Sequence, residues 1–214
     1  MAQTGKDAMT EPAETAPGFE EVVDGVWHWR IRNRAIGGSL SSSQLVAFDG
    51  EAVLVDPVRL APDAMAALPR PTATCLTAKC HQRSAWRYRD ELGAPVWAPQ
   101  GTAAMDAEPD HRYAAGDSLP GGLRAVHTPG PEDVHFCLLL ERAEGVLLCS
   151  DLLSRREGGE LRFVPLEYHD DPAATRRSVE GLLDLPFAVL CLDHGPPIAD
   201  DPKGAIRDLL ERTA

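Results

Sequence analysis

Three short segments of the 214-residue chain gather side chains that could do chemistry, and each comes at the end of an apolar run. Cys80-His81 comes shortly after TATCLT, Asp151 directly follows GVLLCS, and His194 directly follows AVLCLD. Thiolate, carboxylate and imidazole are the groups with which proteins bind zinc. An imidazole beside a carboxylate can also work as a general acid–base pair. The sequence therefore indicates a metal site or an acid–base pair, provided that the fold brings the ends of these runs together.

The apolar runs predict the elements that would position these side chains. A hairpin is expected at Asp49-Gly50, which separates two apolar runs. Further strands are expected at 72–77, 94–99, 122–130, 135–142, 145–153 and 188–195, with a second hairpin turning at Ala143-Glu144-Gly145. Helices are expected at 62–68, 83–92, 101–106, 172–184 and 202–212. Strands dominate first and then alternate with helices, which predicts an α+β sandwich of two helix-covered sheets.

Composition excludes several classes of protein. The chain carries 21 Lys plus Arg against 33 Asp plus Glu, a net charge of −12, and such a chain repels nucleic-acid phosphates. No apolar run approaches the ~20 residues that span a bilayer, and the N-terminal segment lacks the apolar centre of a signal peptide. We therefore expect a cytoplasmic protein with reduced core cysteines, a disordered tail over 1–20 and a single domain over 21–214. Nucleic acid and membrane are not expected as partners, and the oligomeric state is left open.

The order of the segments resembles the metallo-β-lactamase superfamily over about residues 22–212. VLVDP (53–57) matches an apolar strand that ends in Asp, and CLT (75–77) matches the strand before the family's histidine-rich metal loop. HTPG (127–130), LLCSDLL (147–153) and LDHG (192–195) match the segments that carry the later metal ligands. The resemblance implies a four-layer αβ/βα sandwich. It also implies a hydrolase that attacks a small ester, thioester or lactam-like substrate with metal-activated water.

The positions that should ligate the metal depart from the family pattern. Where the family reads Thr-His-x-His-x-Asp-His, this chain has Thr77-Ala78-Lys79-Cys80-His81-Gln82-Arg83. Pro131 stands where a further ligand histidine is expected, so only Asp151 and His194 keep their family identity. Alanine and proline offer no donor atom, and Arg83 is expected to bring an unpaired positive charge to a cation site.

The first interpretation is that the dinuclear zinc site is largely lost and the protein is a pseudoenzyme without a cofactor. Its remnant pocket would bind a small, anionic molecule through Cys80, His81 and Arg83, because the last two form a cationic corner before a helix. Asp151 and His194 would be the catalytic pair, or a hydrogen-bonded relic that raises the pKa of the histidine. Asp56, at the end of VLVDP, is expected to have a structural role in a turn.

The second interpretation is a hydrolase with a remade mononuclear zinc site. Its ligands would be Cys80, Asp151 and His194, with Glu132 or His135 as a further donor. His81 is not counted, because neighbours in an extended stretch point in opposite directions and Cys80 already faces the site. The two interpretations differ in whether the protein binds zinc. A third interpretation is an interaction module that only uses the scaffold, for which the acidic composition offers no specific support.

Overall fold

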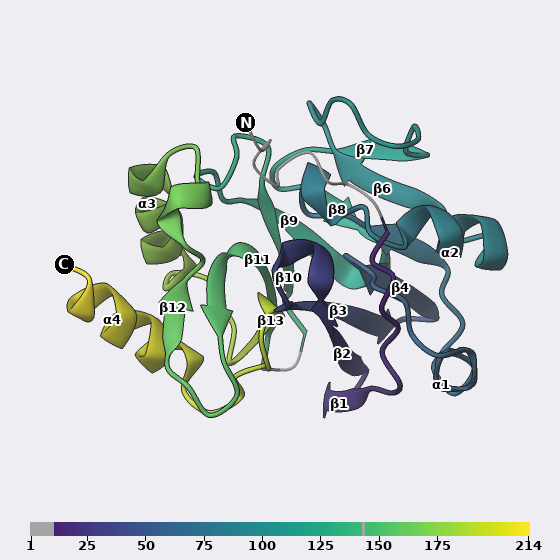
Figure 1. Cartoon of the computed structure of the whole chain (residues 1–214), viewed down its shortest axis with the longest axis horizontal. Helices are drawn as coiled ribbons and strands as arrows, with labels where there is room; N and C mark the ends of the chain where they lie inside the picture. The colour runs from purple at the N-terminus through teal and green to yellow at the C-terminus, as the bar shows by residue number, and fades with distance from the viewer. Residues whose placement is uncertain (1–10, 143) are drawn as a thin grey trace.

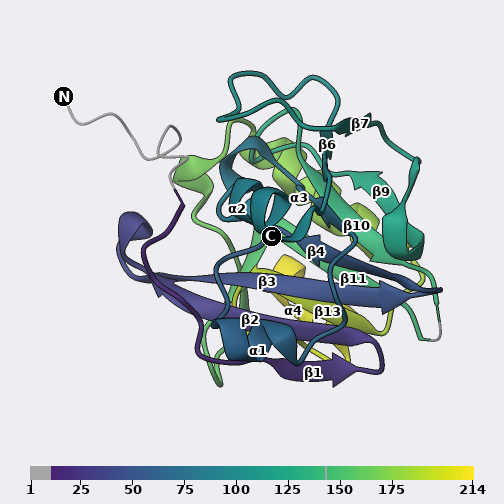
Figure 2. The ribbon, with the colours of Figure 1, turned by 90° about the vertical axis from the view of Figure 1, so that its right-hand side faces the viewer.

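Two β-sheets pack face to face with helices on their outer sides in the computed structural model, which describes residues 11–142 and 144–214 (Figure 1). The first sheet has seven strands in sequence order, β1-β2-β3-β4-β5-β6-β7. These strands are β1 (Glu20–Val23), β2 (Val26–Asn33), β3 (Ser39–Phe48), β4 (Glu51–Val55), β5 (Ala73–Cys75), β6 (Val96–Pro99) and β7 (His111–Tyr113). Helices α1 (Pro62–Ala66) and α2 (Ala85–Leu92) lie on its outer side, nearest the viewer in Figure 2.

The second sheet has six strands, of which β12-β11-β10-β9-β8 are neighbours in that order and β13 pairs with β11 in parallel. They are β8 (Ser118–Leu119), β9 (Leu123–His127), β10 (Phe136–Leu140), β11 (Val146–Arg155), β12 (Leu161–Phe163) and β13 (Val189–His194). Helices α3 (Pro172–Leu182) and α4 (Pro202–Arg212) cover its outer side. Short 3-10 turns are η1 (Arg34–Ile36), η2 (Lys79–His81), η3 (Pro120–Gly122) and η4 (Leu166–Tyr168).

The hydrophobic core is layered in the same way as the fold. Between the sheets, Val46 and Val53 of the first sheet pack in one buried cluster with Leu138 and Leu148 of the second. A separate cluster lies between the second sheet and helices α3 and α4, and another lies on the outer side of the first sheet. Because each sheet is covered on both faces, central strands such as β4 and β10 read as nearly continuous apolar runs.

The expected sandwich is confirmed, with the strands near 45–55 and 145–151 in different sheets. The first hairpin turns at Asp49 and Gly50, whose φ angles of 51° and 82° are those of the turn that this pair favours. The predicted helix at 101–106 is wrong. Ala104 has a φ of 53°, which a right-handed helix excludes, and the Thr102 hydroxyl instead donates to the Pro99 carbonyl. Ala143 of the second predicted hairpin turn lies outside the described residues.

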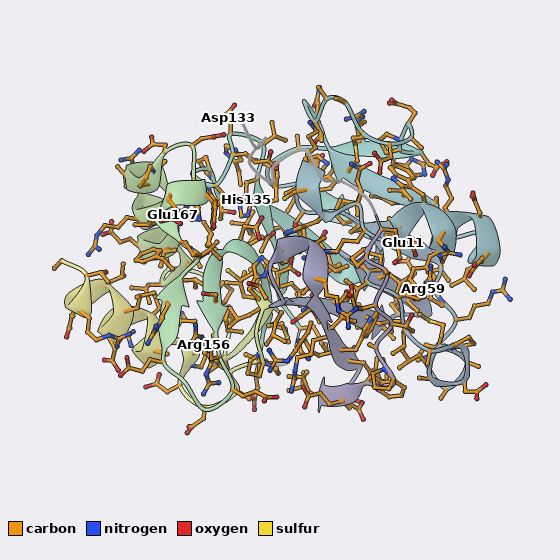
Figure 3. All side chains as sticks on the ribbon, in the orientation of Figure 1. Glu11, Arg59, Asp133, His135, Arg156 and Glu167 are labelled. Atoms are coloured by element: carbon orange, nitrogen blue, oxygen red, sulfur yellow. The ribbon has the colours of Figure 1, made fainter. Side chains whose placement is uncertain are left out.

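Residues 11–20 correct the prediction of a disordered tail that reaches residue 20. Ala16 is buried and forms backbone hydrogen bonds with Arg59 and Ala61. The Glu11 carboxylate accepts two hydrogen bonds from Arg87, at 2.7 and 2.8 Å, and one from Arg59 at 3.1 Å (Figure 3). The polar composition of residues 11–20 pointed to a mobile tail, but ion pairs and backbone hydrogen bonds hold this segment, and Ala16 and Phe19 add apolar contacts to the outer cluster of the first sheet.

Within the described ranges, no helix is both long and apolar enough to cross a membrane.

Candidate metal centre

Strand ends from both sheets meet at one edge of the sandwich. The first sheet contributes Asp56 after β4 and the 77–83 loop after β5, and the second contributes Asp151 in β11 and His194 at the end of β13. The pairing of β11 with β13 is irregular between Cys149 and Ser154, so Asp151 lies in an interruption of the ladder. Such an irregularity re-aims a side chain, here toward the 77–83 loop.

Two residues of this edge have strained backbones. Asp56 has a φ of 45° and Arg83 a φ of 40°, values that side chains with a Cβ adopt only when their surroundings enforce them. The Asp56 carboxylate accepts a hydrogen bond from the Thr77 amide at 2.9 Å and another from the Thr77 hydroxyl. Asp56 therefore ties the end of β4 to the start of the 77–83 loop, in keeping with the structural role expected for it.

His81 points into the site, contrary to the expectation from an extended stretch. Lys79–His81 is a 3-10 turn, in which neighbouring side chains no longer face opposite sides. Its Nδ1 lies 3.0 Å from Asp56 Oδ2 and 3.1 Å from Asp193 Oδ2, and its Nε2 lies 3.2 Å from Asp151 Oδ1. Burial opposes a charge on the ring, but the carboxylates of Asp151 and Asp193 outweigh it and raise the pKa of His81 well above its usual value.

Asp151 and His194 form the pair that the sequence suggested. His194 Nε2 lies 2.7 Å from Asp151 Oδ1, and its Nδ1 donates to the Leu40 carbonyl at 2.6 Å. Although burial works against both charges, the His194 pKa is raised and the Asp151 pKa is lowered well below its usual value, because His81 and His194 both face this carboxylate. The predicted direction for His194 is confirmed.

Arg83 does not present an unpaired charge, and that expectation is wrong. Its guanidinium donates to Asp193 Oδ2 at 2.7 Å, and to the backbone carbonyls of Ser42 and Asp56 at 2.7 and 2.9 Å. The side chain is buried, so its donors are spent within the protein. The sequence contained a signal for this pairing. Asp193 ends the apolar strand AVLCLD, and a buried carboxylate needs a cationic partner.

The other predicted donors differ in their access to this centre. Cys80 is exposed and its Sγ lies 3.3 Å from Asp151 Oδ2. The Glu132 carboxylate accepts from the Lys79 amide at 3.1 Å. His135 Nε2 accepts from the Asp151 amide at 3.1 Å, and its Nδ1 donates to the Thr128 carbonyl at 2.8 Å. Both nitrogens of His135 are therefore engaged, and its role as a ligand is not supported by the geometry.

Four side chains could hold a metal ion: the ligand atoms of His81, Asp151, Asp193 and His194 lie within 4.8 Å of one another. Asp193 is paired with Arg83, which leaves two imidazoles and one carboxylate, a donor set that suits zinc. With Asp56, Asp151 and Asp193 ionised and Arg83 positive, the centre has two net negative charges when both imidazoles are neutral. A dication would balance this charge, so the residues present fit a metal. Sequence reasoning missed His81 as a ligand, and it missed Asp193 altogether.

Comparison with solved structures identifies the architecture. The chain has the metallo-β-lactamase fold: the metallo-β-lactamase FIM-1 from Pseudomonas aeruginosa, in its mono-zinc form, matches with a TM-score of 0.70 at 15% identity, over 96% of this chain and 99% of that one. A metallo-β-lactamase from Erythrobacter litoralis matches with a TM-score of 0.66 at 17% identity, over 90% of each chain. A metallo-β-lactamase family protein from Thermus thermophilus matches with a TM-score of 0.64 at 21% identity, over 90% of this chain and 79% of that one.

No family model and no curated protein sequence matches this chain. The likeness is therefore one of fold, and the chemistry of the site has to be argued from its own residues.

Proposed function

We propose that this protein is a metal-dependent hydrolase that holds a single metal ion, with zinc as the first candidate, through His81, Asp151 and His194. One observation carries the proposal: both imidazoles direct their Nε2 atoms at the same carboxylate oxygen, Asp151 Oδ1, at 3.2 and 2.7 Å. Two histidines and a carboxylate are a common ligand set of catalytic zinc, which leaves one position for water or substrate.

The surroundings of the two rings support this assignment. The Nδ1 of His81 faces the carboxylates of Asp56 and Asp193, and the Nδ1 of His194 donates to the Leu40 carbonyl. Ligand histidines are held in this way, because the hydrogen bond at one nitrogen leaves the lone pair of the other free for the metal. The chain thus fixes both rings in a ligating orientation.

The metal would supply an activated water near neutral pH and polarise a substrate carbonyl. The residues of the chain hold and orient this centre. Arg83 neutralises Asp193, and Asp56 fixes the loop that carries His81. The side chains of Asp151 and His194 remain 18% and 17% exposed, so that a substrate can approach them, whereas His81 is 4% exposed. By analogy with the β-lactamases of this fold, we propose a small ester, thioester or lactam as substrate.

A second candidate function has one specific observation in its favour. Without a metal, the donors are satisfied by one another, because Asp151 is contacted by Cys80, His81 and His194 and Asp193 is paired with Arg83. A site held by such contacts would be metal-free and, with both His81 and His194 protonated, would no longer carry the net negative charge that excludes a small anionic molecule. The two candidates differ in whether the wild-type protein binds zinc.

Metal analysis followed by calorimetric titration tests the proposal. Protein stripped with a chelator is titrated with Zn²⁺ and compared with the variants Asp151→Asn and His194→Gln and with a control, His111→Gln, at an exposed position of strand β7. We expect one zinc per chain for the wild type and the control, and a loss of affinity of 100-fold or more for the two site variants, beyond the roughly 10–100-fold typical of residues that only support a ligand. A wild-type protein that binds no zinc would overturn the metal proposal and favour the anion pocket.

A further inference from the structure

We infer that Cys80 is a fourth, sulfur ligand of the metal centre, so that the site would have two imidazole nitrogens, one carboxylate and one thiolate. The inference rests on the proposed function and goes beyond the four-residue donor set that the geometry defines. Its experiment separates the two ideas, because the metal can bind with or without sulfur.

The position of the sulfur is the main argument. Asp151 uses its two oxygens on different sides: Oδ1 faces the imidazoles of His81 and His194, and Oδ2 faces Cys80 Sγ at 3.3 Å. Sulfur and both Nε2 atoms therefore surround one carboxylate. The sulfur is not among the ligand atoms that lie within 4.8 Å of one another, so its bond to the cation would require the Cys80 side chain to turn from Asp151 Oδ2 toward the two imidazoles.

The η2 turn supplies the second argument. Cys80 and His81 are consecutive residues of this 3-10 turn, and the turn brings both side chains to Asp151. Two donors delivered by one short turn need no separate loop for each, and the strained Arg83 that follows is anchored to Asp193. The turn is therefore held at both ends, by Asp56 at Thr77 and by Asp193 at Arg83.

Exposure distinguishes Cys80 from the other cysteines. Cys75, Cys137, Cys149 and Cys191 are buried, whereas Cys80 is exposed at the mouth of the centre. On binding, the Cys80 S–H bond breaks, a sulfur–metal bond forms and the proton passes to solvent. The sulfur then no longer donates a hydrogen bond to Asp151 Oδ2, so a lone pair of this oxygen becomes available to the cation.

A thiolate among the ligands sets the metal preference. Soft sulfur favours Zn²⁺, Co²⁺ and Cd²⁺, whereas sites built from oxygen suit Mg²⁺ and Mn²⁺. We therefore expect the wild-type protein to take Cd²⁺ readily, and the variant Cys80→Ser to lose much of that preference relative to Mn²⁺. A purely structural role of Cys80 would change stability without changing the order of the metals.

Cobalt provides a direct test that does not depend on turnover. Chelator-stripped wild type, Cys80→Ser and Cys80→His are titrated with Co²⁺ and followed by absorption spectroscopy, and Zn²⁺ affinities are measured by calorimetry. Of these three proteins, we expect only the wild type to show a thiolate-to-cobalt charge-transfer band in the near ultraviolet. Cys80→Ser should bind Zn²⁺ at least about tenfold more weakly, a loss no smaller than that of a supporting residue. Cys80→His should retain affinity without the band, since imidazole replaces the donor.

The matched control is Cys191→Ala, which removes a buried thiol from the core between the sheets and should keep the band. Protection of Cys80 from iodoacetamide by bound Zn²⁺ gives an independent readout on the unmodified chain. Cobalt binding without a sulfur band, together with unchanged zinc affinity in Cys80→Ser, would overturn the role of Cys80 and leave the three-ligand metal site intact. If the wild type binds no cobalt or zinc at all, both proposals are wrong.

Discussion

The two sheets contribute to the centre in different ways. The second sheet presents Asp151, Asp193 and His194 from strands β11 and β13, where His194 pairs with Ser154 and the two aspartates lie at the register shift between the strands. The first sheet presents His81 and Cys80 from a loop, whose shape depends on strained backbone at Asp56 and Arg83. A donor on a strand is positioned by its place in the sequence, whereas a donor on a loop is positioned by tertiary contacts. We therefore expect the first-sheet side to be the one that single substitutions disturb most.

The largest effect is expected from breaking the buried ion pair between these sides. Arg83→Met removes the guanidinium that contacts Asp193 at 2.7 Å and leaves this buried carboxylate with the His81 imidazole, 3.1 Å away, in place of its permanently charged partner. We expect the free energy of unfolding to fall by about 3–5 kcal/mol, the range for breaking a buried pair. Urea unfolding measures it.

The double variant Arg83→Met with Asp193→Leu is the control for this ion pair. It should recover much of the loss, because no buried charge is left unpaired. A single variant as stable as the wild type would show that the two sides do not depend on this contact.

A pH titration distinguishes the histidines on either side of Asp151. Burial lowers the pKa of His135 to about 4, although the nearby Asp151 carboxylate opposes this, whereas the pKa of His194 is raised. The folded pKa of His135 lies below the unfolded value of about 6.5. The contribution of His135 to the free energy of unfolding is therefore full above that value and is lost as the pH falls toward 4. The loss amounts to about 3 kcal/mol.

NMR titration of the metal-free protein measures both rings. His135 should stay neutral down to about pH 4, and His194 should titrate above a model imidazole. His194 contributes with the opposite sign, since its share of the stability is full below the unfolded pKa and is lost as the pH rises through the folded one. A His135 that titrates near the model-imidazole pKa would mean that its two hydrogen bonds do not hold it neutral.

The fold was predictable from local signals, because those signals act over a few residues. The Asp49-Gly50 hairpin and the proline-initiated helices at Pro172 and Pro202 were found in this way. Of the candidate site, Asp151 and His194 were also predictable, since the resemblance to the metallo-β-lactamase superfamily places ligands at both positions. The signal for the helix at 101–106 was short, and the positive φ of Ala104 excludes the helix although Met105 packs against a buried cluster.

The rest of the candidate site could not be predicted, for a physical reason. The direction of His81 follows from a 3-10 turn that is held by contacts to Asp56 and Asp193, and both contacts join distant parts of the chain. The neutralisation of Arg83 by Asp193 likewise spans the two sheets. A one-residue change in how a loop turns reverses which side chain faces inward, and the sequence pattern of the loop alone does not fix that turn.

On the second-sheet side, Gly195 tests how closely the strand end is packed. Its φ is 152°, and a Cβ at this position would lie 2.2 Å from the Arg155 carbonyl oxygen. Gly195→Ala should therefore displace the backbone next to His194 and lower the free energy of unfolding by about 2–3 kcal/mol through strain and overpacking. Thermal and urea unfolding measure this loss, and Gly158→Ala, which meets open space but has a φ of 63°, controls for the backbone term. Equal losses in the two variants would remove the argument from close approach.

The smallest effect is expected from two adjacent serines of β3, each of which serves one side of the centre. The Ser43 hydroxyl donates to the Asp56 carbonyl at 2.8 Å and accepts from the Val58 amide at 2.6 Å, so it braces the strained turn on the first-sheet side. The Ser42 hydroxyl donates to the Gly195 carbonyl on the second-sheet side at 3.3 Å. Ser43→Ala leaves a buried amide without its partner and should cost about 1–2 kcal/mol, whereas Ser42→Ala leaves only a carbonyl and should cost less. Because Asp56 positions the loop that carries His81, Ser43→Ala should also weaken Zn²⁺ binding several-fold, and Ser42→Ala should leave it unchanged. Calorimetry on the two variants decides the matter, and an equal loss of affinity in both would mean that the loop is no more dependent on tertiary contacts than the strand ends.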